Sequence, residues 1–249
     1  MASSPKTALF IMHDPEADPG LVGERMAERG LVVQPMPVAP TMEDSNPTID
    51  FGDPGAYDVI VPLGSVWSVY DTDTIGNWIG NELAFLADAH GRDIPILGIC
   101  FGGQALAAAL GGTVTRSPHP EVGWRTISSD LPADVADGPW MQWHFDRFTM
   151  PPAAVEIARN EAGPQAFRIG RSVGLQFHPE VSAQILNGWL AGAPASELNK
   201  PEVDVERVRS DTATLAPAAK PRTERLVDWF LDEVAELNLA PVDRRDPRR

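Results

Sequence analysis

Residues 95–104 read Pro95-Ile96-Leu97-Gly98-Ile99-Cys100-Phe101-Gly102-Gly103-Gln104, an apolar strand that turns directly into a helix. Cys100 lies at the corner, with glycines two residues before it and two residues after it. This is the build of a nucleophile elbow, in which small neighbours permit a tight turn that presents a reactive side chain. A helix N-terminus also stabilises a thiolate through its free amide groups. We therefore expect Cys100 to be a nucleophile. The flanking glycines weaken the alternative, a cysteine that only fills the core.

Further apolar runs lie between turn signals, and the first four runs alternate with segments of helical periodicity. This rhythm predicts an α/β fold with a mostly parallel, open sheet flanked by helices. From Thr113 to Phe148 the pattern changes to strands and loops, so we expect some antiparallel strands in the second half. The expected strands are Ala8–Met12, Leu31–Val33, Asp58–Leu63, Ile94–Cys100 and Val173–Phe177, and the expected helices are Asp18–Gly30, Trp78–Ala89 and Gln104–Leu110.

Composition and net charge limit the size of the core and the kinds of partner that the chain can have. The 249 residues are 43% hydrophobic and 22% charged, which suffices for one sizeable core. The net charge of −15 repels phosphate backbones and anionic membrane surfaces, so neither nucleic acid nor a membrane is expected as a partner. The first apolar run, Ala8–Met12, is too short for a secretory core or a membrane span, which predicts a cytoplasmic protein.

A reactive thiol needs a base, and the chain has five histidines. His178 is the best placed, because Pro179 favours extended geometry for the residue before it. In an extended segment residues two apart point to the same face, so Glu180 can hydrogen-bond the His178 ring. Such a carboxylate fixes the tautomer of the base, as the third member of a nucleophile, base and orienter triad. Alone, the segment would be an ordinary His-Pro turn at the end of a strand.

Two segments together resemble a known family. Leu97–Gln104 and Gln176–Glu180 are similar to the two signatures of the class I glutamine amidotransferases, and the resemblance extends from about Asp58 to Val181. It implies a flavodoxin-like arrangement of sheet and helices. The chain is most similar to the stand-alone, GMP-synthase-like branch, as judged from Ser68-Val69-Tyr70-Asp71, Glu121-Val122-Gly123-Trp124 and Trp143-His144-Phe145-Asp146.

The resemblance assigns roles to single residues. It implies Cys100 as nucleophile, His178 as general base and acid, and Glu180 as the residue that orients His178. It also implies an oxyanion hole in which the Phe101 amide is one donor. Gly64, in the turn after an earlier apolar run, is the candidate for the second donor.

Other positions match the family only in part. The family more often has two glycines before a proline in the turn that holds Gly64, so Leu63 and Ser65 are departures. Gln104 matches a side chain that contacts glutamine. The segment of His144, Phe145 and Asp146 corresponds to a second substrate-contact region, where the family usually has glycine in place of phenylalanine.

Machinery for an acceptor reaction is missing from the sequence. No Gly-Lys-Ser/Thr phosphate loop and no Gly-x-Gly-x-x-Gly motif occurs, so any ammonia-accepting synthetase must be a separate chain. No cofactor or metal is expected. The pairs His144/Asp146 and His178/Glu180 suggest a metal cluster as an alternative, but no His-x-x-x-His spacing supports it.

Three interpretations of function remain open. In the first, the chain releases ammonia from L-glutamine through a γ-glutamyl thioester for a synthetase that completes its oxyanion hole. In the second, the same triad hydrolyses another γ-glutamyl compound without a partner. In the third, the domain is regulatory and not catalytic, which the presence of Cys100, His178 and Glu180 makes the weakest.

The sequence predicts a catalytic domain followed by an appendage. Residues 1–194 are expected to form the amidotransferase domain. Ala195–Pro221 is rich in Ala, Pro, Thr and charge, and we expect a linker or loosely docked arm. Arg222–Leu239 repeats apolar residues at helical spacing, which predicts an amphipathic helix packed on its own domain. Asp243–Arg249 is expected to be disordered.

Overall fold

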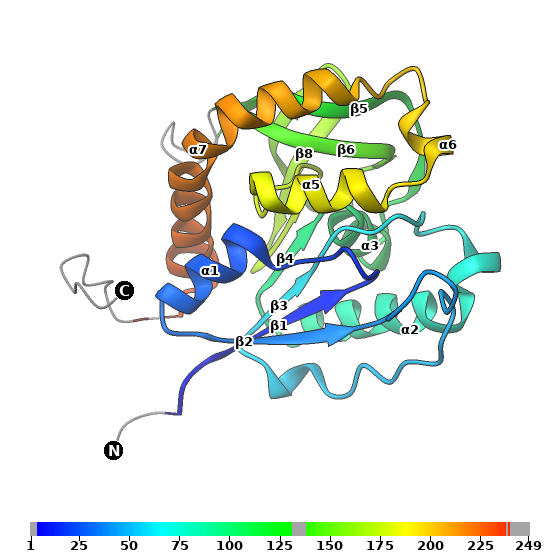
Figure 1. Cartoon of the computed structure of the whole chain (residues 1–249). Helices are drawn as coiled ribbons and strands as arrows, with labels where there is room; N and C mark the ends of the chain where they lie inside the picture. The colour runs from blue at the N-terminus through cyan, green and yellow to red at the C-terminus, as the bar shows by residue number, and fades with distance from the viewer. Residues whose placement is uncertain (1–3, 131–137, 238, 240–249) are drawn as a thin grey trace.

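The computed structural model describes residues 4–130, 138–237 and 239. Within them, nine strands form one mixed sheet in the order β2-β1-β3-β4-β9-β8-β7-β5-β6 (Figure 1). The pairs from β2 to β9 are parallel and the pairs from β9 to β6 are antiparallel. The strands are β1 (Thr7–Met12), β2 (Val32–Pro37), β3 (Val59–Pro62), β4 (Ile96–Ile99), β5 (Val114–Ser129), β6 (Gly138–Phe148), β7 (Val155–Asn160), β8 (Gly163–Ile169) and β9 (Ser172–Leu175).

Helices cover both faces of the parallel strands. One hydrophobic cluster joins these strands to α1, α7 and η2, and a second joins them to α2 and α3 (Figure 1). The helical elements are α1 (Gly20–Glu28), η1 (Pro54–Ala56), α2 (Thr72–Gly91), α3 (Phe101–Ala109), α5 (Ala183–Gly192), α6 (Ala195–Leu198), α7 (Val205–Trp229) and the π-helical turn η2 (Phe230–Val234). The predicted α/β fold, with a mostly parallel sheet and antiparallel members in the second half, is confirmed.

The central strands explain where a site can form. Every residue of β3, β4 and β9 is buried, as expected for strands with helices on both faces. Because these strands are parallel, the residues that follow them gather at one edge of the sheet. In open α/β sheets, ligands bind at this carboxyl edge. Gly64 follows β3, Cys100 follows β4 and His178 follows β9, so the fold brings all three to the same edge.

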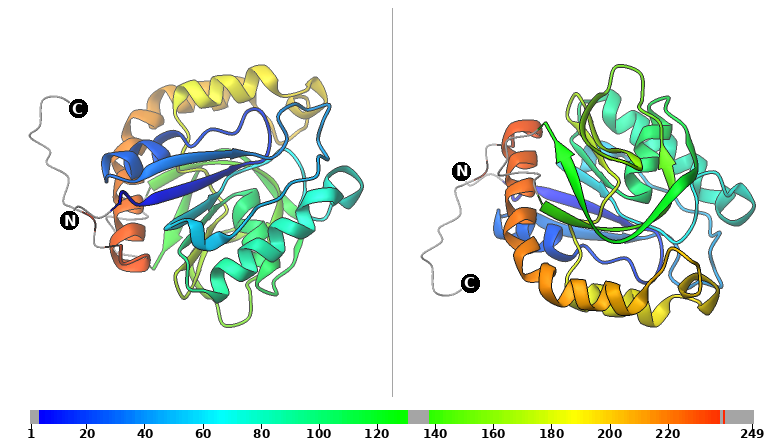
Figure 2. Two further views of the ribbon diagram at one scale, coloured as in Figure 1. Left: turned by 90° about the horizontal axis from the view of Figure 1, so that it is seen from below. Right: turned by 90° about the horizontal axis from the view of Figure 1, so that it is seen from above.

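The C-terminal part differs from the expectation. Ala195–Pro221 does not form a loose arm, because it folds into α6 and most of α7. One face of α7 is buried through Val208, Thr212, Ala216, Ala219 and Thr223. Figure 2 shows α7 following the edge of the molecule as one bent helix, and two prolines, Pro217 and Pro221, lie inside it. A proline removes a helical hydrogen bond and bends the helix.

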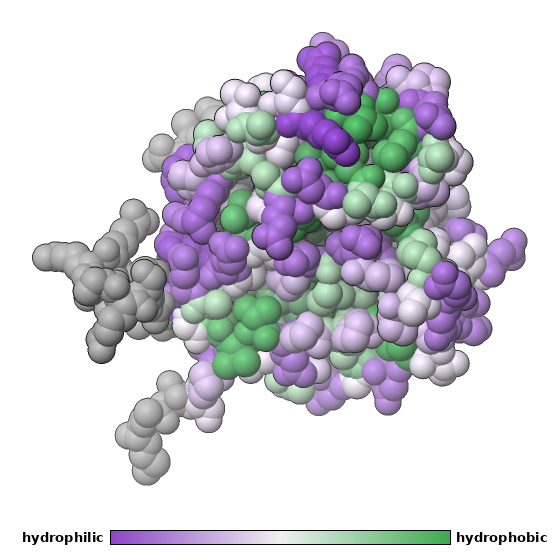
Figure 3. All heavy atoms as spheres, in the orientation of Figure 1, coloured by the Kyte–Doolittle hydropathy of each residue, from purple (hydrophilic) through white to green (hydrophobic). Residues whose placement is uncertain are grey.

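Of the predicted amphipathic helix over Arg222–Leu239, the part up to Val234 is helical and forms the last third of α7 and η2, where Leu226, Phe230 and Val234 are buried. Asp243–Arg249 lies outside the described residues. None of the described helices is both long and apolar enough to cross a membrane. On the face drawn in Figure 3, polar side chains separate the apolar patches, as the many charges predict.

Candidate active site

The corner at Cys100 is a strained turn. Cys100 has φ 52° and ψ −108°, in the left-handed half of conformational space that residues other than glycine rarely occupy. Its amide donates to the Leu175 carbonyl at 2.9 Å, which ties the corner to β9. A Cβ at Gly98 would lie 2.6 Å from the Gly102 carbonyl oxygen, and a Cβ at Gly102 would collide with the Pro62 carbonyl. The two glycines thus permit the elbow that the sequence predicts.

His178 lies beside this corner with its ring held in one orientation. Its Nδ1 is 2.6 Å from Glu180 Oε1, and both side chains are buried. Its backbone amide donates to the Met141 carbonyl of β6 at 2.9 Å. The Trp189 ring of α5 meets the imidazole edge to face, with 4.9 Å between ring centroids. The other ring nitrogen, Nε2, is buried and makes no hydrogen bond within the described part of the chain.

The environment of His178 favours the imidazolium. Burial is the largest single influence and lowers the His178 pKa, but Glu180 and Cys100 together outweigh burial and raise the pKa well above its ordinary value of 6.5. A protonated histidine beside an ionised cysteine is, in general, the charge state in which such a thiol acts as a nucleophile.

The turn after β3 packs against both Cys100 and His178. A Cβ at Gly64 would lie 3.0 Å from His178 Cε1 and 3.9 Å from Cys100 Cβ. The Leu63 carbonyl accepts from the Gly102 amide at 2.9 Å, and the Gly64 carbonyl lies 3.2 Å from His13 Nδ1. Phe101 is the first residue of α3, so its amide has no acceptor within the helix.

The side chains expected to contact substrate form a polar wall. Gln104 is buried, and its amide nitrogen donates to Gln176 Oε1 at 3.2 Å and to the Asp146 carbonyl at 3.3 Å. The Asp146 carboxylate accepts from the Ser68 hydroxyl and, at 2.8 Å, from the Tyr70 hydroxyl. These contacts hold the wall in place before any ligand binds.

His144 and Phe145 have different surroundings. Both ring nitrogens of His144 are engaged, Nδ1 at 3.0 Å from the Asp146 carbonyl and Nε2 at 3.3 Å from Glu121 Oε2. Two cationic side chains lie over the Phe145 ring, with Lys200 Nζ 3.7 Å and Arg116 Cζ 4.8 Å from the ring centroid. Both cations lie within the range of a cation–π interaction.

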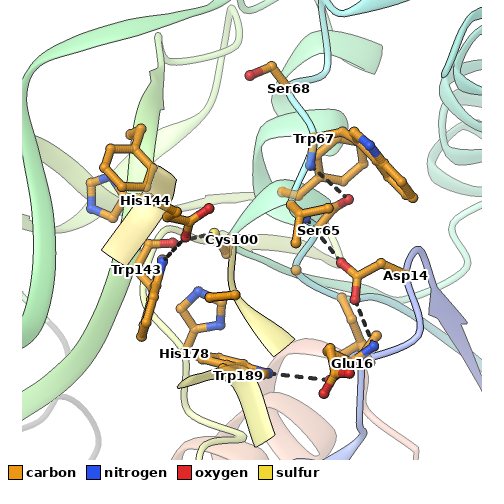
Figure 4. A pocket seen from close by; sticks show the side chains of 18 of the residues that line it. Asp14, Glu16, Ser65, Trp67, Ser68, Cys100, Trp143, His144, His178 and Trp189 are labelled. Carbon is orange, nitrogen blue, oxygen red and sulfur yellow. Dashed lines mark hydrogen bonds between the residues drawn. The ribbon is translucent and has the colours of Figure 1, made fainter. Parts of the chain in front are cut away.

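One cavity of about 390 Å³ joins these groups. Figure 4 shows Cys100 and His178 between Trp143 and His144 on one side and Asp14 and Ser65 on the other. All nine residues predicted for the site line the cavity, namely Gly64, Cys100, Phe101, Gln104, His144, Phe145, Asp146, His178 and Glu180.

Sequence reasoning missed part of the lining. Asp14, Trp189 and Lys200 also face the cavity, from the β1–α1 loop, from α5 and from the segment after α6. No local motif marks them, although Asp14 directly follows the first predicted strand. Among the described residues, no three His, Cys, Asp or Glu side chains are arranged to hold a metal ion.

The family model described as glutamine amidotransferase class-I matches residues 23–187. This chain belongs to that family. The glutamine-hydrolysing GMP synthase of Aeropyrum pernix is 38% identical over 118 residues, which are 40% of this chain and 22% of that protein. The same enzyme of Nocardia farcinica is 37% identical over 139 residues, which are 47% of this chain and 26% of that protein. The match thus spans about a quarter of these larger relatives.

Solved structures with this fold are also similar to the amidotransferase described here. A glutamine amidotransferase from Thermotoga maritima superimposes with a TM-score of 0.77 at 24% identity, covering 94% of this chain and all of that one. A second, from Methylobacillus flagellatus, gives a TM-score of 0.79 at 24% identity and covers 98% of this chain and all of that one. Both likenesses extend over nearly the whole chain.

Proposed function

We propose that this amidotransferase hydrolyses the side-chain amide of L-glutamine through Cys100, His178 and Glu180. One observation carries the proposal. The buried Nε2 of His178 makes no hydrogen bond to the described chain, while Glu180 occupies Nδ1 and the Cys100 charge acts on the same ring. A proton on Nε2 therefore has no role in holding the fold together and can be transferred.

The reaction divides into two displacements. Cys100 Sγ attacks the amide carbon, and the electrons of the C=O double bond move to the oxygen. When this oxyanion collapses, the C–N bond breaks and His178 Nε2 gives its proton to the leaving nitrogen, which departs as ammonia. A γ-glutamyl thioester remains. Water then gives a proton to Nε2 and attacks the thioester, the C–S bond breaks, and glutamate and the thiolate are released.

Glu180 keeps the base in the state that this sequence requires. With Nδ1–H donated to Glu180 at 2.6 Å, the second proton of the imidazolium must sit on Nε2, on the side of the thiol. The carboxylate also stabilises the positive charge that the ring carries between proton transfers. The Phe101 and Gly64 amides are our candidates for oxyanion donors.

The fate of ammonia is the second part of the proposal. The GMP synthases that resemble this chain are glutamine-hydrolysing, and the matched segment is about a quarter of their length. We assign the acceptor reaction to a synthetase on a separate chain. No phosphate-binding motif occurs within these 249 residues, which is consistent with an acceptor site outside them.

A specific observation favours a second candidate function. Phe145 stands where the family usually has glycine, and it holds Lys200 and Arg116 at the cavity. Two cations at this wall suit a γ-glutamyl compound whose leaving group carries a carboxylate. Such an enzyme would be a self-sufficient hydrolase on the same triad.

Steady-state ammonia or amine release separates the two functions. The isolated chain is assayed with L-glutamine and with γ-glutamyl amides and dipeptides, with Cys100→Ala as the blank. Slow release from glutamine that a co-purifying synthetase accelerates supports the amidotransferase function. Fast release from a γ-glutamyl dipeptide that no partner changes would replace it by the hydrolase.

A further inference from the structure

His13 is a buried histidine that the reaction scheme does not use. It follows β1 and is fully buried, with its ring 4.6 Å from the Phe101 ring centroid and 5.7 Å from that of Trp78. Both ring nitrogens have partners. Nε2 is 2.9 Å from Glu82 Oε1 of α2, and Nδ1 is 3.2 Å from the Gly64 carbonyl oxygen. Glu82 is also fully buried, so this is an imidazole–carboxylate pair inside the second hydrophobic cluster.

The proton on Nδ1 follows from the partners. A carbonyl oxygen only accepts hydrogen bonds, so the contact with Gly64 requires Nδ1–H. If Glu82 is ionised, Nε2 must also carry a proton and His13 is an imidazolium. If Glu82 is protonated, it donates to Nε2 and His13 is the neutral Nδ1–H tautomer. In both states of the pair, the Gly64 carbonyl has its donor.

This hydrogen bond orients one peptide unit of the turn after β3. The Gly64 carbonyl and the Ser65 amide belong to the same planar trans peptide, so they point in opposite directions. The carbonyl points at His13, which is buried beneath the turn. The Ser65 amide then points away from the core, and Ser65 lines the cavity beside Cys100 and His178 (Figure 4). Within the described chain this amide donates no hydrogen bond.

We propose that the His13–Glu82 pair is a positioning element of the oxyanion hole, which holds the Gly64–Ser65 peptide so that the Ser65 amide faces the reacting carbonyl. This inference rests on the proposed function and adds one detail to it, since the Ser65 amide joins the Phe101 and Gly64 amides as a donor. A glycine at position 64 allows the turn to lie against His178, because a Cβ there would sit 3.0 Å from the ring.

The neighbouring peptide is held independently. The Leu63 carbonyl accepts from the Gly102 amide at 2.9 Å, so the first peptide of the turn is tied to α3. On the other side, the Asp14 carboxylate accepts from the Val66 amide and so holds the Ser65–Val66 peptide. The Gly64–Ser65 peptide between them is held by His13. Loss of the His13 donor would free the Gly64–Ser65 peptide to rotate. Losing one oxyanion donor lowers turnover by about 10²–10³.

A matched pair of double variants tests the proposal. Asn and Leu have similar size, but only the Asn amide can donate to the Gly64 carbonyl, so we compare His13→Asn with His13→Leu. Both carry Glu82→Gln, which avoids an unpaired buried carboxylate in either protein. The readouts are kcat and KM for the best amide substrate, the rate of Cys100 alkylation by iodoacetamide, and the affinity for glutamate γ-semialdehyde. Alkylation forms no oxyanion, whereas the aldehyde adds to the thiol and places its oxygen in the hole.

The leucine protein should have a kcat about 10²-fold below that of the asparagine protein, with KM changed less than about threefold. Its affinity for the semialdehyde should fall similarly, while the alkylation rates stay equal. Equal kcat values, or an alkylation rate that falls with kcat, would overturn the proposal. If circular dichroism shows the leucine protein to be unfolded, His13→Phe takes its place, because it keeps an aromatic ring against Trp78 and Phe101. A chain that hydrolyses no amide but keeps the difference in semialdehyde affinity would refute the proposed function and retain this inference.

Discussion

Two buried histidine–carboxylate pairs contact the turn after β3. They differ in whether the second ring nitrogen of the histidine has a hydrogen-bond partner. In His178–Glu180, Nδ1 meets the carboxylate and Nε2 makes no hydrogen bond to the described chain. In His13–Glu82, Nε2 meets the carboxylate and Nδ1 meets the Gly64 carbonyl. Burial is the largest single influence on each histidine and lowers its pKa, but the other groups at the ring together outweigh burial and leave the pKa raised: Glu82, Gly64 and Asp14 for His13, and Glu180 and Cys100 for His178.

The difference shows how the same pair of residue types can serve two purposes. A ring whose second nitrogen is free can exchange a proton with a reactant. A ring with both nitrogens engaged cannot do so without breaking a structural hydrogen bond, so it can only orient what it touches. The predictions below test this distinction.

The largest effect should come from the ring with the free nitrogen. His178→Ala should lower kcat by about 10⁶, and Cys100→Ala should be about equally damaging, because members of one catalytic unit are not additive. Steady-state ammonia release measures this loss, with His119→Ala as a control at an exposed position. A greater loss from His144→Ala than from His178→Ala would show that the base is misassigned.

The carboxylates should separate the two pairs next. Glu180→Gln should lower kcat by up to about 10⁴, since the amide keeps the shape but cannot stabilise the imidazolium. Glu82→Gln should cost less than about tenfold, because the new side-chain amide can donate to His13 Nε2 and leave the proton on Nδ1. Kinetics of the two variants with the same substrate provide the check. Equal losses would remove the distinction between the pairs.

A hydrogen bond from α7 should stabilise the segment that holds His178. The buried hydroxyl of Thr223 on α7 donates to the Pro179 carbonyl at 2.7 Å, next to His178. Thr223→Val leaves this carbonyl unpaired and should lower the free energy of unfolding by about 1–3 kcal/mol. Thr214→Val, at an exposed position of the same helix, should change it by less than about 0.5 kcal/mol. Urea denaturation of both variants measures the difference. If Thr223→Val left the free energy of unfolding unchanged, this hydrogen bond from α7 would not stabilise the His178 segment.

The smallest effect is a pH dependence of stability. A histidine whose folded pKa is raised stabilises the native state fully below its unfolded pKa of about 6.5, and that contribution is lost as pH rises through the folded pKa. The free energy of unfolding, measured with urea, should therefore fall between neutral and alkaline pH, by about 1.4 kcal/mol for each unit of the pKa shift. His178→Gln should flatten the fall, and His119→Gln should not. Parallel curves for wild type and His178→Gln would contradict the raised pKa.

The elbow could be predicted because its causes are local. Gly98 and Gly102 are required because a Cβ at either position would collide with a neighbouring backbone carbonyl. Cys100 directly follows β4. The His178–Glu180 contact is also local, because the two residues are two positions apart in an extended segment. Short-range rules of strand and turn geometry suffice for both.

Ala195–Pro221 folds into helices that its sequence does not predict, and the reason is physical. Its buried positions hold small residues, such as Thr212, Ala216 and Ala219, and two prolines interrupt the helical pattern. Alanine and threonine give a weak apolar stripe, and proline ordinarily ends a helix. The surface of β5 and β6 supplies what the sequence of α7 lacks, since Trp124 of β5 donates to the Thr212 hydroxyl at 2.8 Å.

By itself, the sequence determined the tight corner at Cys100, the contact between His178 and Glu180 and the alternation of strands and helices, because each depends on residues within a few positions of one another. Only the tertiary structure decided the partners of His13. Glu82 is 69 residues away and Gly64 is 51, and their meeting follows from the order of β1 and β3 in the sheet and the packing of α2 against it. No periodicity encodes such a contact, since a histidine after a strand has the same local sequence whether it faces solvent, a carboxylate or a carbonyl.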